Sequence, residues 1–238
     1  MAEFEAKFGR AVTLKLEDTF RCLQSLCDIS SNFVQKNPKQ LRKRVRSVKP
    51  NVAQPVRIVC VDDEAKIQTA IERRVRELAN EYAVPGRQLH IYVVGRYPKE
   101  REHLPPASID NRVKLEFVTA HSSKGLEADH VMVPRMTSET LGFPSRIEDG
   151  PVQQLAMPGG DTFEDAEELR LFYLTLTRAR STVTLVTLAH RKSTFIAELI
   201  RDHELEVHDL NGEIGSARAY PECQEGRDRP PLLHHWKR

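Results

Sequence analysis

The chain has 238 residues, of which 39% are hydrophobic and 29% charged. That balance is typical of a soluble globular protein with one good core or two small ones, so it excludes fibrous and disordered classes. No apolar run approaches the ~20 residues that span a bilayer. Glu3 and Glu5 stand where a secretory signal would carry positive charge. We therefore expect a cytoplasmic protein without membrane contact.

Cysteine usage and charge give weaker constraints. The four cysteines, at positions 22, 27, 60 and 223, form no Cys-x-x-Cys pair, so we expect reduced thiols and no metal site. The net charge of +2 does not by itself indicate nucleic acid. However, seven basic and no acidic residues lie between Lys36 and Lys49. This run either contacts DNA phosphates or is a solvated helix extension, and the steepness of DNA binding against salt distinguishes the two.

The first half of the chain alternates between helical and strand patterns. Apolar residues at helical spacing predict a helix over residues 18–34 and a second one carrying Ile67, Ile71, Val75 and Leu78. Short apolar runs predict buried strands at 56–61 and 89–94.

The second half continues the alternation after a polar loop at 98–106. Strands are expected at 113–120, 131–133 and 182–188. Between them lie an irregular insert at 136–160 and a helix that opens at a capping box, Thr162 to Asp165, and runs to about Ala179. This order predicts an α/β fold with a mainly parallel sheet covered by helices on both faces. We expect one such domain over residues 1–205 and a frayed tail over 206–238.

One segment at the end of a predicted strand carries candidate ligand-binding groups. Residues 119–127 read Thr-Ala-His-Ser-Ser-Lys-Gly-Leu-Glu. Ligands of α/β sheets favour such strand ends, glycine allows close approach, Lys124 can meet a phosphate and Glu127 can accept a hydrogen bond from a ribose hydroxyl. Taken as spacing alone, the segment fits an ordinary strand-to-helix turn equally well.

A second segment ends in arginines. Residues 167–180 read Glu-Glu-Leu-Arg-Leu-Phe-Tyr-Leu-Thr-Leu-Thr-Arg-Ala-Arg, a largely apolar helix that leads into a buried strand. Arg178 is either a C-terminal charge that suits the helix dipole or an arginine aimed at a phosphate across an interface.

These two segments resemble motifs V and VI of superfamily 1 helicases of the UvrD/Rep group. Residues 16–21, Leu-Glu-Asp-Thr-Phe-Arg, lie where that family carries motif IV. The runs Asn-Phe-Val-Gln-Lys-Asn-Pro at 32–38 and Gly-Phe-Pro-Ser at 142–145 are most similar to the helicase IV branch. The resemblance covers residues 10–200 and implies a second RecA-like domain that closes over ATP and Mg²⁺ held mainly by a first domain.

The resemblance also implies roles for individual residues. Arg178 would be the motif VI arginine finger and Arg21 the motif IV arginine that reaches the γ-phosphate. Gly125 and Glu127 would meet the sugar and phosphate region. Three residues would lie toward single-stranded DNA or a DNA junction: Thr119, His121 and Lys124. The expected activity is ATP-driven DNA translocation and unwinding, with 3′-to-5′ movement and a place in DNA repair.

The chain departs from the family pattern in what it lacks. It contains no Gly-x-x-x-x-Gly-Lys-Ser/Thr loop, and the acids after the strand at 56–61 fall between motifs IV and V, at a helix N-terminus. We therefore expect negligible ATP hydrolysis by this chain alone and a P-loop-bearing partner domain in cis or in trans. In residues 220–226, Tyr220 replaces the first cysteine of a zinc knuckle, so zinc binding there is not expected.

Two other interpretations compete with this one. A stand-alone nucleic-acid-binding or regulatory module derived from a helicase would bind DNA or a partner without needing Arg178. A phospho-signalling receiver is suggested by residues 58–64, but its Lys-Pro turn would have to follow the acidic cluster, and Lys49-Pro50 precedes it. The receiver interpretation is rejected.

Overall fold

The protein is built around one seven-stranded sheet. The computed structural model describes residues 8–9, 17–40, 45–52, 54–147, 163 and 165–215. Six neighbouring strands are parallel, and only the last pair is antiparallel. The order across the sheet is β5 (Val113–Thr119), β4 (Leu89–Gly95), β6 (Ala128–Val133), β7 (Ala179–Leu188), β3 (Val56–Val61), β8 (Val207–His208) and β9 (Ile214–Gly215). The predicted α/β fold with a mainly parallel sheet is confirmed.

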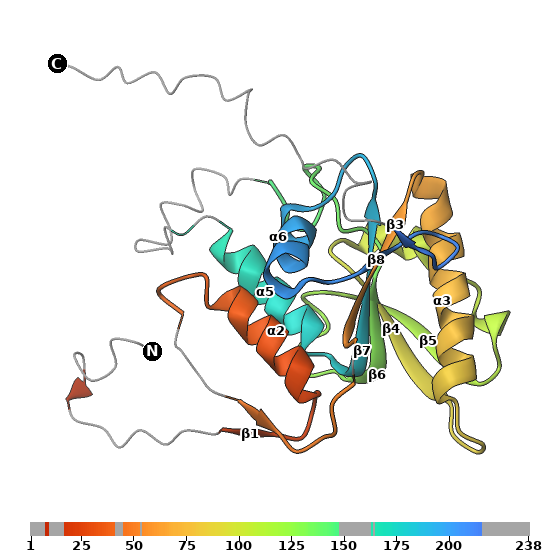
Figure 1. Ribbon diagram of the computed structural model, residues 1–238, viewed down its shortest axis with the longest axis horizontal. Helices are drawn as coiled ribbons and strands as arrows, with labels where there is room; N and C mark the ends of the chain where they lie inside the picture. Colours follow the sequence, from red (N-terminus) through yellow and green to blue (C-terminus); the bar gives the residue numbers. More distant parts are fainter. Residues whose placement is uncertain are drawn as a thin grey trace.

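Helices cover both faces of this sheet, as Figure 1 shows. Alternate residues of β3 belong to different cores: Val59 and Val61 pack with α3 (Ile67–Tyr82), whereas Ile58 and Cys60 face the other side. The four apolar residues that predicted α3 are completely buried. The opposite face is covered by α2 (Gln24–Val34), α5 (Ala166–Leu176) and α6 (Thr194–His203).

An aromatic cluster holds these three helices together. Phe33 of α2 packs edge-on against Phe172 of α5, with ring centroids 5.1 Å apart, and against Phe195 of α6 at 4.9 Å. Phe143, from the loop after β6, completes the cluster at 5.4 Å from Phe172. The runs at 32–38 and 142–145 therefore each supply a core phenylalanine that packs against α5.

Several element boundaries differ from the predictions. The helix expected from residue 18 begins at Gln24, because β1 (Asp18–Thr19) pairs instead with β2 (Arg46–Ser47) in a separate two-stranded sheet. The helix expected to reach Ala179 ends at Leu176, and β7 begins at Ala179. The predicted loop at 98–106 contains the 3₁₀ helix η2 (Pro98–His103), and two further short ones are η1 (Glu64–Lys66) and η3 (Ala107–Ile109).

The start of the frayed tail is also corrected. β8 pairs with β3 beyond the expected boundary at residue 205, and β9 extends the sheet to Gly215. The α6 helix that leads to β8 was not predicted, although Ser193 caps it by accepting a hydrogen bond from the Phe195 amide. The degenerate zinc knuckle at 220–226 lies outside the described residues.

The predicted capping box is not formed. Asp165 occupies the N-cap of α5 with a left-handed φ of 56°, instead of the third helical position that a capping box requires. Thr162 and residues 148–160 of the insert lie outside the described part, and residues 136–147 form turns with one bridge between Thr137 and Lys192. None of the helices that the structure describes is long and apolar enough to cross a membrane.

Candidate functional site at the amino edge of the sheet

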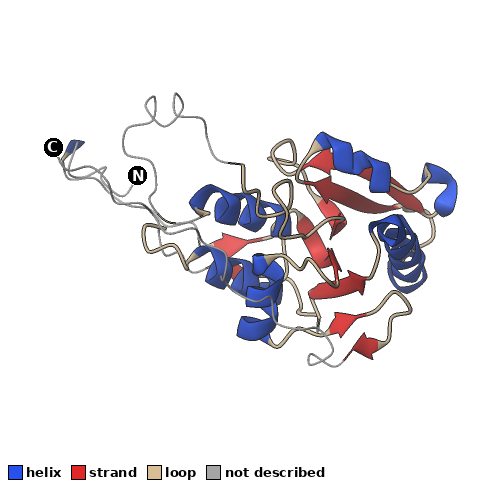
Figure 2. Cartoon of the chain, turned by 90° about the horizontal axis from the view of Figure 1, so that it is seen from above, coloured by secondary structure: helices blue, strands red, loops and turns tan. Residues whose placement is uncertain are grey.

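The segment 119–127 crosses from one edge of the sheet to the other. Thr119 pairs with Gly95 where β5 and β4 end, whereas Ala128 pairs with Ala179 where β6 and β7 begin. A strand of this length spans roughly 20 Å, so the residues of this one segment serve two distant sites. Glu127 lies at the amino edge together with Arg178, and Thr119 lies at the carboxyl edge. Figure 2 shows the same sheet from above, with its helices on either side.

At the amino edge, one carboxylate joins two arginines from different parts of the chain. Arg21 Nε donates to Glu127 Oε1 at 2.8 Å, and Arg180 Nε donates to Glu127 Oε2 at 3.1 Å. Arg21 follows β1, and its carbonyl accepts a hydrogen bond from Lys49 Nζ at 2.5 Å. The small β1–β2 sheet therefore positions Arg21 beside the start of β6.

Arg178 lies where α5 ends and β7 begins. Its Nε donates to the Leu174 carbonyl at 3.0 Å and its Nη1 to the Leu126 carbonyl at 3.3 Å. Arg178 is 4% exposed. It thus caps the C-terminal carbonyls of α5, as the helix-dipole interpretation expected, while it also joins α5 to the 119–127 segment.

The charges of this cluster act on one another. Burial is the largest cause of the lowered pKa of Arg178, and the positive charge of Arg21 lowers it further. Burial by itself raises the pKa of Glu127, but the hydrogen bonds and charges of Arg21 and Arg180 outweigh it, and the net pKa lies below its usual value. Arg21 and Arg180 thus bind the ionised Glu127, and Arg180 also lies 3.8 Å from Asp129. Nearby, the guanidinium of Arg178 is bound to carbonyls and pairs with no carboxylate among the described residues, which makes this edge suited to an anion.

The backbone of the segment explains its glycine. Gly125 has a left-handed φ of 89°, a conformation that other residues rarely adopt, and its surroundings would leave room for a Cβ. The conformation, and not crowding, therefore favours glycine there. Lys124 and Gly125 are exposed.

The residues expected to contact DNA form a separate group near the carboxyl edge. Thr119 Oγ1 and Ser122 Oγ lie 2.8 Å apart, and Ser122 Oγ also donates to the Thr119 carbonyl at 3.1 Å, which fixes a tight turn after β5. His121 and Lys124 are exposed. Lys124 lies midway along the crossing segment, so the structure separates Thr119 and His121 from the arginine cluster.

Three features near the two edges of the sheet were not predicted from the sequence. Arg180 was assigned no role, although it shares Glu127 with Arg21. The second is a thiol pair: Cys22 and Cys27 are buried, and their sulfur atoms lie 3.0 Å apart. The hydrogen bond from Cys27 is the largest cause that lowers the pKa of Cys22 to about 7, and the nearby charge of Arg21 contributes. Cys22 lies just before α2 and Cys27 in its first turns, so helical spacing gives no signal for this pair.

The third feature is a nearly buried ion pair. Glu168 in the first turn of α5 accepts hydrogen bonds from two nitrogens of Arg96: Nη2 at 2.7 Å, and Nε at 3.1 Å to Oε1 and 3.2 Å to Oε2. The amide of Ser145 donates to the same carboxylate at 2.9 Å. Glu168 thereby joins the end of β4, the Gly-Phe-Pro-Ser run and the motif VI helix.

Comparison with known proteins agrees with the resemblance seen in the sequence. Residues 100–190 match the model of the UvrD-like helicase C-terminal domain. Over 210 residues the chain is 28% identical to DNA helicase IV of Escherichia coli (strain K12), an alignment that covers 86% of this chain and 28% of that protein. The chain thus spans less than a third of that relative's length.

One solved structure is also similar: the C-terminal domain of a possible DNA helicase from Lactobacillus plantarum WCFS1. It has a TM-score of 0.46 and 16% sequence identity, and the match covers 81% of this chain and 99% of that one. The matched residues 100–190 include both the 119–127 segment and the helix that ends before Arg178. Arg21 lies outside them. The similarity to a UvrD-like helicase C-terminal domain, inferred first from motifs, is confirmed.

Proposed function

We propose that this chain is the second RecA-like half of an ATP-dependent DNA helicase and that its amino-edge cluster completes an ATP site held mainly by a first, P-loop-bearing domain. The convergence of Arg21, Glu127 and Arg178 carries this proposal. The three residues belong to segments that resemble three different helicase motifs, IV, V and VI. Arg21 and Glu127 are 106 residues apart in sequence, yet they are hydrogen-bonded in the folded chain.

The cluster has the chemistry that phosphate groups require. Arginines offer several N–H donors and a permanent charge, and an arginine supplied across an interface stabilises the charge that develops during phosphoryl transfer. Arg21 and Arg180 have side-chain exposures of 39% and 44%, so an incoming anion can reach them. Arg178 is held by two carbonyls, and we propose that closure of the two halves directs its remaining donors toward the γ-phosphate.

The residues of this cluster suit ATP better than they suit Mg²⁺. The guanidinium groups of Arg21 and Arg178 suit the phosphates, and Gly125 and Glu127 suit the sugar and phosphate region. Glu127, already paired with two arginines, is a poor magnesium ligand. Magnesium, which neutralises phosphate charge when bound, is therefore assigned to the partner domain.

The carboxyl-edge residues are proposed to face single-stranded DNA. The turn after β5 exposes His121 and Lys124, which can contact the sugar-phosphate backbone without reading sequence. The same segment, residues 119–127, ends at Glu127 in the proposed nucleotide site. A movement of Glu127 on ATP binding would therefore be transmitted through a few residues of backbone to His121 at the proposed DNA site.

The decisive experiment mixes this chain with the P-loop-bearing first domain of a DNA helicase IV-type protein and measures DNA-stimulated ATP hydrolysis. We expect negligible turnover by the chain alone, turnover in the mixture, and a loss of roughly 10³-fold in kcat for Arg178→Ala. Arg201→Ala, on the exposed face of α6, is the matched control.

The same measurement tests the alternative of a stand-alone binding module. That module would bind DNA equally well with Arg178→Ala and would yield no turnover with any first domain. Turnover by the isolated chain that depends on Arg178 would overturn the requirement for a partner.

A further inference from the structure

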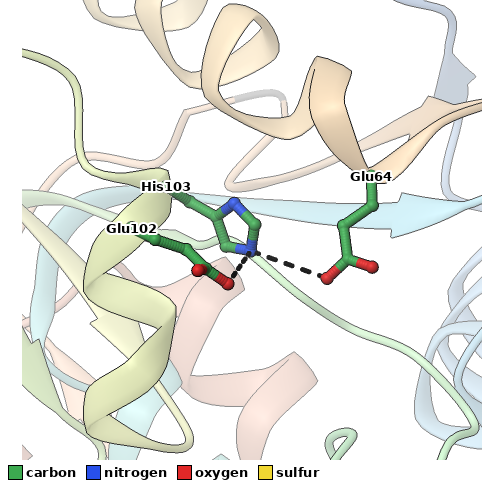
Figure 3. A group of neighbouring side chains, drawn as sticks. All are labelled: Glu64, Glu102 and His103. Atoms are coloured by element: carbon green, nitrogen blue, oxygen red, sulfur yellow. Dashed lines mark ion pairs between the residues drawn. The ribbon is translucent and has the colours of Figure 1, made fainter.

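A second cluster of titratable groups lies at the carboxyl edge of the sheet, opposite the arginine cluster. Glu64 begins η1, directly after β3, and Glu102 and His103 end η2, which follows β4. Although β6 and β7 separate β3 from β4 in the sheet, the ligand atoms of these three side chains all lie within 4.8 Å of one another. Figure 3 shows the imidazole of His103 directed between the two carboxylates.

The state of His103 sets this cluster apart from an ordinary group of surface acids. Its side chain is only 8% exposed, and its Nε2 atom is buried without a hydrogen-bond partner. The nearest carboxylate oxygens are 3.9 Å away on Glu102 and 4.0 Å away on Glu64, too far for hydrogen bonds. A buried nitrogen without a protein partner is unfavourable, so this atom is available to bind a ligand from outside the chain.

We propose that Glu64, Glu102 and His103 bind a divalent transition-metal cation, with Zn²⁺ as the best match. One imidazole nitrogen and two carboxylate oxygens are ligands that zinc accepts, and three protein ligands leave a fourth position for water. Ligand atoms on one zinc ion are roughly 3.3 Å apart, given metal–ligand bonds of about 2.0–2.1 Å. The His103 Nε2 separations of 3.9 and 4.0 Å require a contraction of under about 1 Å, and the two carboxylates, within 4.8 Å of each other, require one of up to about 1.5 Å, which rotation of two exposed glutamate side chains can supply. The carboxylates of Glu64 and Glu102 are 43% and 52% exposed, so the ion has access from solvent.

Two positive groups oppose this site, Lys99 at longer range and Arg135 in contact. Arg135 Nε lies 3.0 Å from Glu64 Oε1, and its positive charge competes with a cation. However, Arg135 also contacts Glu139, which in turn contacts Arg191. Arg135 therefore keeps a carboxylate partner, Glu139, when Glu64 turns to a metal.

Such an ion would join the connection after β3 to the connection after β4. Two strands, β6 and β7, lie between β3 and β4, so the hydrogen bonds of the sheet do not link these connections directly. No metal site was predicted, because the cysteines form no Cys-x-x-Cys pair. Glu64 lies 38 positions before Glu102, and no local motif marks the Glu64, Glu102 and His103 set. The site does not depend on the proposed helicase role.

The test is titration of the metal-free full chain with Zn²⁺ by calorimetry, without nucleotide or DNA. We expect one equivalent whose affinity falls by roughly tenfold or more in Glu102→Gln and in His103→Gln. Glu102 is half exposed, so its variant remains informative if His103→Gln fails to fold. Glu167→Gln, an exposed glutamate on α5, is the matched control and should bind as the parent does.

Binding of Co²⁺ in place of Zn²⁺ shows by its absorption spectrum whether the metal binds at this site, at the cysteine thiols or in the tail over residues 206–238. Binding through nitrogen and oxygen gives visible cobalt bands without a thiolate charge-transfer band, and these bands should vanish in Glu102→Gln. Absence of Zn²⁺ binding, a thiolate spectrum, or equal affinity in the parent and Glu102→Gln would each overturn the proposal.

Discussion

Arg21 Nε donates to Glu127 Oε1 at 2.8 Å, and this bond joins the end of β1 to the start of β6. The two side chains are 39% and 29% exposed. Glu127 therefore orients an arginine at an accessible edge of the sheet, where it does little to hold the core together. Such a carboxylate is suited to keeping guanidinium groups in place until an anion arrives.

Glu127→Gln should separate function from stability. Because pairs this exposed are screened by solvent, we expect the free energy of unfolding to change by about 1 kcal/mol or less. DNA-stimulated ATP hydrolysis in the mixture with a first helicase domain should nevertheless fall, since Arg21 and Arg180 lose their common partner. Denaturant unfolding and turnover are measured on the same preparation. A loss of several kcal/mol would instead assign Glu127 a structural role.

Glu168→Ala should be strongly destabilising. The variant leaves Arg96, whose side chain is 15% exposed, without its carboxylate and also removes the acceptor of the Ser145 amide. Breaking such a pair costs about 3–5 kcal/mol, because an uncompensated charge remains in a poorly hydrated place. Glu167→Ala alters the neighbouring exposed residue and should change the unfolding free energy by under roughly 0.5 kcal/mol. Equal effects of the two variants would contradict this account.

Phe143→Ala tests whether the Gly-Phe-Pro-Ser run is part of the core. Phe143 is completely buried against Phe172, and its carbonyl accepts a hydrogen bond from Ser193 Oγ at the start of α6. Truncation should cost about 3–5 kcal/mol of unfolding free energy. Leu141→Ala, two residues earlier and 44% exposed, provides the comparison and should cost much less.

The sequence predicted the regular layers well because their causes are local. The residues that predicted α3 repeat at helical spacing and are all buried, and the run at 56–61 coincides with β3. The predicted element boundaries were wrong where pairing with a distant segment overrides the local pattern. Asp18 and Thr19 fit the helical pattern, yet they pair with Arg46 and Ser47.

The candidate site was predictable only through resemblance. No periodicity relates Arg21 to Glu127, since their contact depends on how β1 and β6 pack in three dimensions. Arg180 was missed for the same reason: an exposed arginine at the start of a strand has no distinctive local signal. The His103 cluster requires the connections after two separated strands to meet, which becomes visible only in the folded chain.

His130 should make stability depend on pH. Burial is the largest cause that lowers its pKa to about 4, and the ring is 1% exposed beside Thr182. The unfolded chain therefore binds more protons than the folded one between pH 4 and the ordinary value of 6.5, so stability is lost as pH falls through this window. Relative to His130→Gln, the parent should lose about 3 kcal/mol between pH 7 and pH 4. His190→Gln, an exposed histidine, should follow the parent's profile.

The basic run and the 119–127 segment make different predictions for DNA binding. Lys36 Nζ lies 2.6 Å from both Glu198 and Asp202, and Lys49 Nζ binds the Arg21 carbonyl. These two lysines are thus engaged within the protein, while Lys124 is exposed. If Lys124 neutralises one phosphate of single-stranded DNA, Lys124→Gln should reduce the slope of log affinity against log salt by about 0.7. Lys36→Gln should leave that slope unchanged. A reduced slope for Lys36→Gln with none for Lys124→Gln would move the DNA contact from the sheet edge to the basic run.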